Sequence, residues 1–308
     1  MPGPGSERRR WLAALRGNRK AMLGFGLVGS FLVMALVGPS FVQDASAFLA
    51  TPHEPPSVAH WFGTTGQGQD VFAQTVVGAR TTLAVGFGCG VLVILVGALV
   101  GATAGYMGGR IDEGLSLLTN VFLVLPGLPL MVVIAAWLPA GPGTLLAVLT
   151  LTGWAWNARV LRAQTLALRG KDFVAAAQVA GEGPLRIVVS QILPNMLSLL
   201  VSSFIGATVY AIGAQVGLEF LGLGDIGAVT WGTNLYWASN DSALLTGAWW
   251  TFVPTGACIA LVGFGLTLIN FAIDEIANPS LQAETTWRKK LASRPSPGGG
   301  TPVEPGLV

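Results

Sequence analysis

Charged residues are scarce in this sequence. Asp, Glu, Lys and Arg make up 10% of its 308 residues and hydrophobic residues 52%, whereas soluble globular chains carry about 25% charged residues. So small a charged fraction leaves too little polar surface to cover a soluble fold. The few charges are also bunched, and long uncharged tracts separate them. Because a bilayer requires tracts of that length, the composition predicts a membrane protein.

Ionisable side chains are missing from six of these tracts. They cover residues 21–41, 81–107, 114–138, 144–157, 187–218 and 242–273. A bilayer is spanned by a helix of about 20 apolar residues, so we expect an all-α membrane protein with six transmembrane helices. The fourth tract is short, and the fifth is overlong and must include a part that does not span. Ion-coupled carriers hold ionisable groups within the membrane, so a secondary carrier is only a distant alternative. A passive channel, the other distant alternative, stays open at this point beside a transporter subunit powered from outside.

The sequence also lacks the residue patterns that are typical of catalytic and metal centres. Its two cysteines, Cys89 and Cys258, lie in expected spans, and its two histidines, His53 and His60, lie in a proline-rich segment. Their spacing is not typical of a disulfide framework or a metal site. The phosphate-binding pattern Gly-x-x-x-x-Gly-Lys-Ser/Thr is absent. We therefore expect no catalytic residue, no bound cofactor or metal, and no ATPase site in this chain.

Lysine and arginine are distributed unevenly. With both termini inside, sixteen of the 17 fall in inner segments and only Arg80 falls outside. By the positive-inside rule this bias predicts a multi-pass membrane protein with both termini in the cytoplasm. The basic residues then report topology, and no nucleic-acid partner is expected. A signal peptide cleaved near Ala45, Ser46 and Ala47 is the alternative for the first tract, which is longer than the usual core of about 7–15 residues.

These patterns divide the chain into five parts. Residues 1–20 form a basic cytoplasmic N-terminus, and 21–41 form the first transmembrane helix. An extracytoplasmic loop rich in proline and glycine follows at 42–80, in which Asp70 and Arg80 are candidates to pair. Residues 81–282 form a core of five helices, and 283–308 form a disordered cytoplasmic tail of low complexity.

A short helix is expected in the inner loop that follows the fourth tract. Asp172 is a suitable N-cap, the alanine-rich run after it favours a helix, and Gly181 is a suitable C-terminal stop. An apolar helix in a cytoplasmic loop has no lipid to face and is typical of a docking element for another protein. An amphipathic connector that lies on the lipid surface is the alternative.

Several segments resemble one family of transporters. The run Asp172-Phe173-Val174-Ala175-Ala176-Ala177, with Gly181 and Ile192-Leu193-Pro194-Asn195, resembles the EAA loop of ABC-importer permeases, here residues 171–195. Further motifs in the expected order narrow the resemblance to the C-type subunit of the dipeptide/oligopeptide/nickel group. They are His60-Trp61-Phe62-Gly63-Thr64, Val77-Gly78-Ala79-Arg80-Thr81, Tyr106-Met107-Gly108-Gly109-Arg110, Leu125-Pro126-Gly127-Leu128-Pro129 and Phe220-Leu221-Gly222-Leu223-Gly224. The resemblance covers about residues 10–282.

The resemblance implies that residues 172–181 form a coupling helix seated in a groove of a partner ATPase, which uses the ATP. Phe173 and Val174 are expected to make its apolar contacts. Ala175 stands where the family usually has a glutamate, and Glu182 is the candidate substitute. The implied partners are a second, B-type permease, two ABC ATPase subunits, an extracytoplasmic solute-binding protein and membrane lipid. Residues expected at the ATPase contact are Asp172, Phe173, Val174, Ala175, Ala176, Ala177, Gly181 and Glu182.

The substrate and parts of the pathway are implied in the same way. Short peptides delivered by the binding protein are the expected substrate, and oligosaccharides are the alternative. Aromatic residues gather at 231–250, where they suit either the membrane interface or a lip that receives substrate. The residues expected at the outer mouth of the pathway are Glu219, Trp231 and Asn270, and those expected at hinges are Pro126, Pro129 and Pro194.

Overall fold

The computed structural model describes residues 18–48 and 50–277, and this part of the chain consists of helices and loops without a β-strand. The long helices are α2 (Arg19–Val37), α3 (Val71–Met107), α4 (Gly109–Val124), α5 (Gly127–Trp137), α6 (Pro142–Arg169), α10 (Leu197–Phe220), α11 (Trp231–Asn240) and α13 (Val253–Ala277). The short elements are η1 (Gly38–Ser40), α7 (Asp172–Val179), α8 (Pro184–Ile187), the π-helix η2 (Val188–Ile192), α9 (Leu193–Asn195), α12 (Ala243–Thr246) and η3 (Trp249–Thr251).

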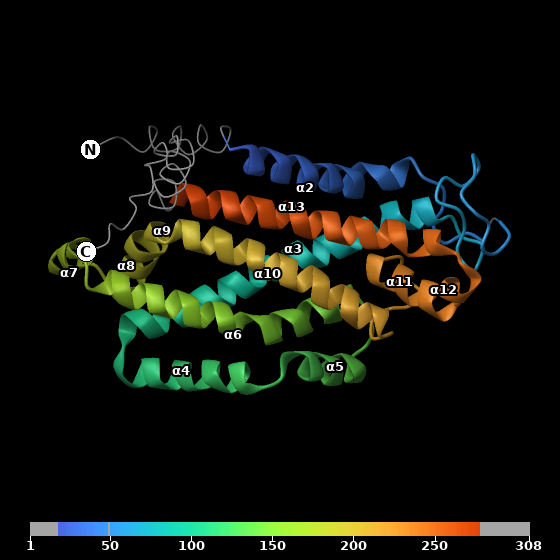
Figure 1. Cartoon of the computed structure of the whole chain (residues 1–308). Helices are drawn as coiled ribbons and strands as arrows, with labels where there is room; N and C mark the ends of the chain where they lie inside the picture. Colours follow the sequence, from blue (N-terminus) through green and yellow to red (C-terminus); the bar gives the residue numbers. More distant parts are fainter. Residues whose placement is uncertain (1–17, 49, 278–308) are drawn as a thin grey trace, which may run out of the picture.

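The long helices run side by side (Figure 1). Helices α4 and α5 lie along one edge beside α6, and α2 lies along the opposite edge beside α13. Helices α7 to α9 lie at one end of the molecule, the α7 end, and α11 and α12 lie at the other, the α11 end. Helix α2 begins and α13 finishes at the α7 end, where the side chains of Asn18 and Lys20 donate to Glu275 Oε2 over 3.2 and 3.4 Å.

Four helical segments are long and apolar enough to cross a membrane: Arg19–Ser40, Val71–Met107, Leu197–Phe220 and Trp249–Ile276. Helices α4 and α5 would form a fifth crossing if they are one broken span, since they meet at a bend of 87°. The all-helical membrane architecture predicted from the sequence is therefore confirmed, with four or five candidate spans. The sixth span expected from the sequence would have to be α6. This helix is not among the candidate spans, and its 28 residues include three arginines, Arg159, Arg162 and Arg169.

Helix α3 begins at Val71, ten residues before the uncharged tract. Asp70 caps it, because Asp70 Oδ1 accepts from the Ala73 N–H over 2.7 Å, and Asp70 Oδ2 lies 2.8 Å from His60 Nδ1. The expected pairing of Asp70 with Arg80 is wrong, since ten helical residues place Arg80 about 15 Å along the axis from the cap. Arg80 is exposed and joins none of the ion pairs of the described residues.

Helix α3 packs more extensively on α6 than on any other element. Gly97, Gly101 and Gly105 follow one another at intervals of four residues and face α6. A Cβ atom on Gly105 would lie 2.8 Å from the carbonyl oxygen of Arg162, and one on Gly101 would overlap the carbonyl of Ala158. Small residues at this spacing let two membrane helices approach closely. This packing places the middle of α6 against α3.

Prolines mark the boundaries of several elements. Pro126 is the N-cap of α5, and Pro129 lies in its first turn, at the 87° bend after α4. Pro194 lies in α9, between the π-helix and α10, so the overlong fifth tract contains a part outside α10 as predicted. Pro254 lies in the first turn of α13, which begins at Val253. The breaks coincide with the predicted hinges, and movement at them stays a prediction.

Candidate functional site

The short helix α7 lies where the sequence predicts a docking element. It covers Asp172–Val179, and its N-cap is Lys171 rather than Asp172, which lies in the first turn instead. Its C-terminal end follows the Schellman pattern: Gly181 has a φ of +81°, its N–H donates to Gln178 O, and the Glu182 N–H donates to Ala177 O. The predicted stop at Gly181 is confirmed, because this backbone conformation favours glycine.

One face of α7 packs on the rest of the chain. Val174 is fully buried, Ala177 is 8% exposed, and Phe173 packs partly buried against the same cluster. Gln178 Nε2 donates to the Tyr106 hydroxyl at the end of α3 over 3.3 Å. The helix is thereby attached to α3, to α6 and to the segment that leads into α10. The buried residues of this cluster are Tyr106, Leu161, Val174, Ala177, Ile187, Ile192 and Met196.

The opposite face of α7 is open. Ala175 and Ala176 are exposed, and the Val179 side chain is 90% exposed. Val174 therefore cannot make the contact predicted for it, because its side chain points into the molecule. Glu182, the candidate substitute for the absent glutamate, is turned toward Arg186, with 3.9 Å between Oε1 and Nε. A partner that binds here would meet alanine methyl groups and Val179.

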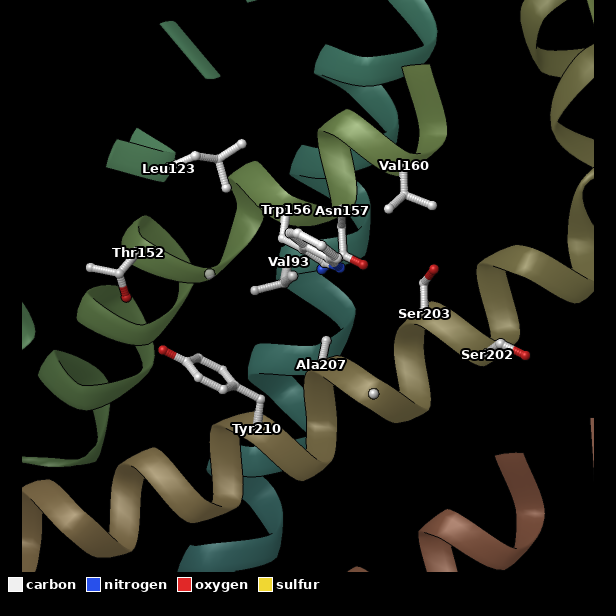
Figure 2. A pocket seen from close by; sticks show the side chains of 12 residues that line it. Val93, Leu123, Thr152, Trp156, Asn157, Val160, Ser202, Ser203, Ala207 and Tyr210 are labelled. Atoms are coloured by element: carbon white, nitrogen blue, oxygen red, sulfur yellow. The ribbon is translucent and has the colours of Figure 1, made fainter. Parts of the chain in front are cut away.

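A cavity of about 560 Å³ opens between the long helices (Figure 2). In Figure 2, Tyr210 projects from α10 toward α6, and Ser203 points from α10 toward the part of α6 that carries Val160. Its lining contains no charged side chain. Lining residues come from α3 (Val93), α4 (Leu123), α6 (Thr152, Gly153, Trp156, Asn157, Val160) and α10 (Ser202, Ser203, Gly206, Ala207, Tyr210).

Neutral polar groups give the cavity its binding chemistry. Asn157 is 8% exposed, and its side-chain amide makes no hydrogen bond within the described residues. A buried amide without a partner is costly, so Asn157 is available to pair with a molecule in the cavity. Ser202 is occupied, since its hydroxyl donates to Asp274 Oδ1 over 2.7 Å. Trp156 is 64% exposed and offers an aromatic surface.

The residues predicted for the outer mouth do not line this cavity. Glu219 is 2% exposed, and its carboxylate accepts from Gln215 Nε2 over 3.0 Å and from Thr230 Oγ1 over 2.6 Å. Trp231 is fully buried, and its Nε1–H donates to Thr75 O over 2.9 Å. Both side chains hold α11 against α10 and α3 and are not open to a pathway. Asn270 lies in α13, outside the cavity lining.

Sequence reasoning missed most of the cavity lining. Tyr210, Ser203 and Trp156 were not singled out. The spacing offered a signal, since residues 203, 206, 207 and 210 fall on one face of a helix, as do 153, 156, 157 and 160. Small and polar residues share those two faces within otherwise apolar helices. Such a face is typical of a helix that borders a polar space.

Known proteins resemble this chain over most of its length. Residues 94–279 match the family model of the binding-protein-dependent transport system inner membrane component. The dipeptide transport system permease protein DppC of Bacillus subtilis (strain 168) is 35% identical over 277 residues, which is 87% of this chain and 84% of that protein. The oligopeptide transport system permease protein OppC of the same organism is 32% identical over 272 residues, 87% of this chain and 88% of that protein.

Solved structures also resemble the fold. One of them is a chain of the MetNI methionine ABC transporter in inward-facing conformations, with a TM-score of 0.52 and 21% identity, and the match covers 66% of this chain and 94% of that chain. This likeness concerns the fold alone. The family match takes in α6, α7 and α10, which carry the exposed face of α7 and most of the cavity lining. The chain belongs to the family of binding-protein-dependent transport system inner membrane components.

Proposed function

We propose that this chain is one permease subunit of an ATP-driven importer of short peptides and forms half of its translocation pathway. The proposal rests on the sequence similarity of this chain, over 87% of its length, to proteins named as dipeptide and oligopeptide permeases. The uncharged cavity supports it, because peptide groups are neutral and both donate and accept hydrogen bonds.

We also propose six transmembrane spans with both termini in the cytoplasm. The spans are α2, α3, the broken pair α4–α5, α6, α10 and α13. The placement of lysine and arginine supports this orientation. The start of α2 and the finish of α13 lie at the α7 end, as two cytoplasmic termini would require. The α7 end then faces the cytoplasm and the α11 end faces outward.

Helix α7 is the proposed coupling helix. Its exposed face at Ala175, Ala176 and Val179 docks on one of two partner ATPases, which bind and hydrolyse the ATP in place of this chain. Closure of the ATPases pushes α7, and the buried cluster around Val174 passes the movement to α3, α6 and α10. A second permease of the B-type completes the pathway, and a solute-binding protein delivers substrate at the α11 end.

The cavity is the proposed contact surface for the substrate. The unpaired amide of Asn157 pairs with a peptide group, and Tyr210 and Ser203 supply hydroxyls elsewhere in the cavity lining. Oligosaccharides are the second candidate, because the exposed Trp156 ring suits stacking against a sugar face. Substitution of Trp156 by alanine separates the two, since sugar uptake depends on the ring more strongly than peptide uptake does.

Reconstitution tests the proposal. The assembled complex in vesicles should take up labelled di- and oligopeptides only with ATP and the binding protein. Asn157→Ala should lower peptide uptake about tenfold, as expected for loss of one or two desolvated hydrogen bonds, with α7 and ATPase assembly intact. Asn195→Ala is the matched control, because Asn195 is exposed and bonds only to Gln191 O. Uptake driven by an ion gradient alone, or a complex without an ATPase, would exclude the proposal.

A further inference from the structure

A second cavity, of about 310 Å³, lies between α3, α4 and α6 in the half of the bundle toward the α7 end. Two guanidinium groups, two hydroxyls and one amide line it, so its chemistry differs from that of the uncharged cavity of Figure 2. The polar and basic residues at its wall are Ser116, Thr119, Asn120, Arg159 and Arg162.

The charge of Arg162 is compensated within the chain. Its Nε and Nη2 donate to the two carboxylate oxygens of Asp112, the second over 2.7 Å, and Ser116 Oγ donates to the same carboxylate over 3.0 Å. A bidentate pair of this kind is neutral overall and holds a fixed geometry. Arg162 and Asp112 therefore form one side of the cavity and add no net charge to it.

The charge of Arg159 is not compensated. Its Nη2 donates over 2.8 Å to Asn120 Oδ1, which is a neutral amide, and none of the ion pairs among the described residues includes Arg159. Ten residues separate it from Arg169 at the C-terminal end of α6, which is about 15 Å along the helix axis. A guanidinium at such a position in a membrane helix is costly without an anion. The position therefore calls for an oxyanion from outside the chain.

Apolar side chains flank the guanidinium. Leu117 and Val124 lie one turn on either side of Asn120 and are 66% and 83% exposed, and Trp156 lies one turn before Arg159 and is 64% exposed. A soluble anion would use only the guanidinium and leave these apolar surfaces uncovered. A molecule that carries both an oxyanion and a hydrocarbon chain would cover both.

We propose that this cavity binds the headgroup phosphate of an anionic phospholipid from the leaflet at the α7 end, with an acyl chain that runs along Val124 toward the middle of the bundle. Arg159, held by Asn120, donates to the phosphate, and the hydroxyls of Ser116 and Thr119 border it. Basic cavities between membrane helices on the cytoplasmic side suit such headgroups. The position of Arg159 within a membrane span and the assignment to the cytoplasmic leaflet rest on the proposed spans and orientation.

Lipid titration tests this site in the full-length chain, purified in mild detergent with its co-purifying subunits and stripped of lipid. Native mass spectrometry counts phosphatidylglycerol and phosphatidylcholine bound to each variant. We expect Arg159→Gln to lower phosphatidylglycerol affinity about tenfold, as loss of a charge-assisted hydrogen bond implies. Phosphatidylcholine affinity should fall much less, because the choline cation already offsets the charge of its phosphate. Arg159→Lys should retain most of the preference. The matched control is Arg110→Gln, which removes an exposed charge from the same end outside the cavity.

A second variant separates a lipid from a soluble anion. Val124→Gln keeps every charge and should weaken phosphatidylglycerol binding by shortening the apolar surface, and inorganic phosphate should fail to displace the lipid. Displacement by inorganic phosphate, an equal loss in Arg110→Gln, or an unchanged preference in Arg159→Gln would overturn the proposal. So would a cross-link from position 159 to an acidic residue of a partner subunit in the lipid-free complex. None of these readouts requires transport, so failure of peptide uptake would leave the lipid result standing.

Discussion

Val174 and Val179 lie on opposite faces of α7, and the same substitution at each one tests how this helix is attached to the bundle. Val174 is fully buried in the cluster with Tyr106 and Leu161, and Val179 is 90% exposed. A helix of eight residues is unstable by itself in water, so α7 persists because its buried face packs on the chain. Loss of that packing should open α7 locally and leave the long helices in place.

The magnitude follows from burial. Val174→Ala removes two buried carbon groups, each worth about 0.8 kcal/mol, and leaves a small void, for a total loss of about 2 kcal/mol. Val179→Ala removes the same groups from a solvent-exposed position and should cost almost no stability. Both variants gain about 0.5 kcal/mol from the higher helix propensity of alanine, so the difference between them isolates burial. A difference of about 2 kcal/mol corresponds to about 30-fold in the opening equilibrium.

Hydrogen exchange measures that equilibrium directly. The amides of Ala180, Gly181 and Glu182 donate to carbonyls of α7 and should exchange about 30-fold faster in Val174→Ala than in Val179→Ala in the chain without partners. Amides of α10 should be unchanged in both variants. The exposed position should matter in the assembled complex instead, where Val179→Asp should weaken ATPase docking without opening α7. Equal exchange in the two alanine variants would refute the assignment of an inward and an outward face.

Three further substitutions have defined outcomes. Gly181→Ala should cost about 1 kcal/mol, because the residue has a φ of +81° with open space around it, and should speed amide exchange at the end of α7. Gly101→Ala should lower the thermal unfolding midpoint by several degrees, since its methyl group would overlap the backbone of α6, whereas Gly26→Ala, with nothing nearby, should not. Trp231→Phe should destabilise the chain by about 1–2 kcal/mol by removing the buried indole hydrogen bond to Thr75 O, which denaturant titration would measure.

Local chemistry made the end of α7 predictable from the sequence. Gly181 after an alanine-rich run is sufficient, because the Schellman pattern depends on a few adjacent residues and on one positive φ. The start of the helix was less well predicted. Asp172 lies one residue too far along to be the N-cap, and as an acidic residue in the first turn it still stabilises the positive end of the helix dipole.

The direction in which α7 faces was not predictable, because both of its faces carry apolar residues. Val174 and Val179 are equally apolar in the sequence, and only the position of the cluster around Tyr106 decides which of them is buried. The same limit applies at the α11 end. Trp231 was expected at a wet surface because aromatic rings gather at interfaces, yet Thr75 and Phe31, more than 150 positions away, enclose it.

Helix α6 extends beyond its apolar tract for a reason that also lies in distant contacts. The uncharged tract ends at Asn157, and α6 continues to Arg169. The carboxylate of Asp112, 50 positions away, makes Arg162 part of a neutral bridge to α4. A hydropathy average includes only neighbours in sequence and therefore counts Arg162 as a full charge. The same average cannot distinguish Arg162 from Arg159, which has no carboxylate partner among the described residues. Arg162 belongs to a structural ion pair, whereas Arg159, three residues away, calls for an external anion.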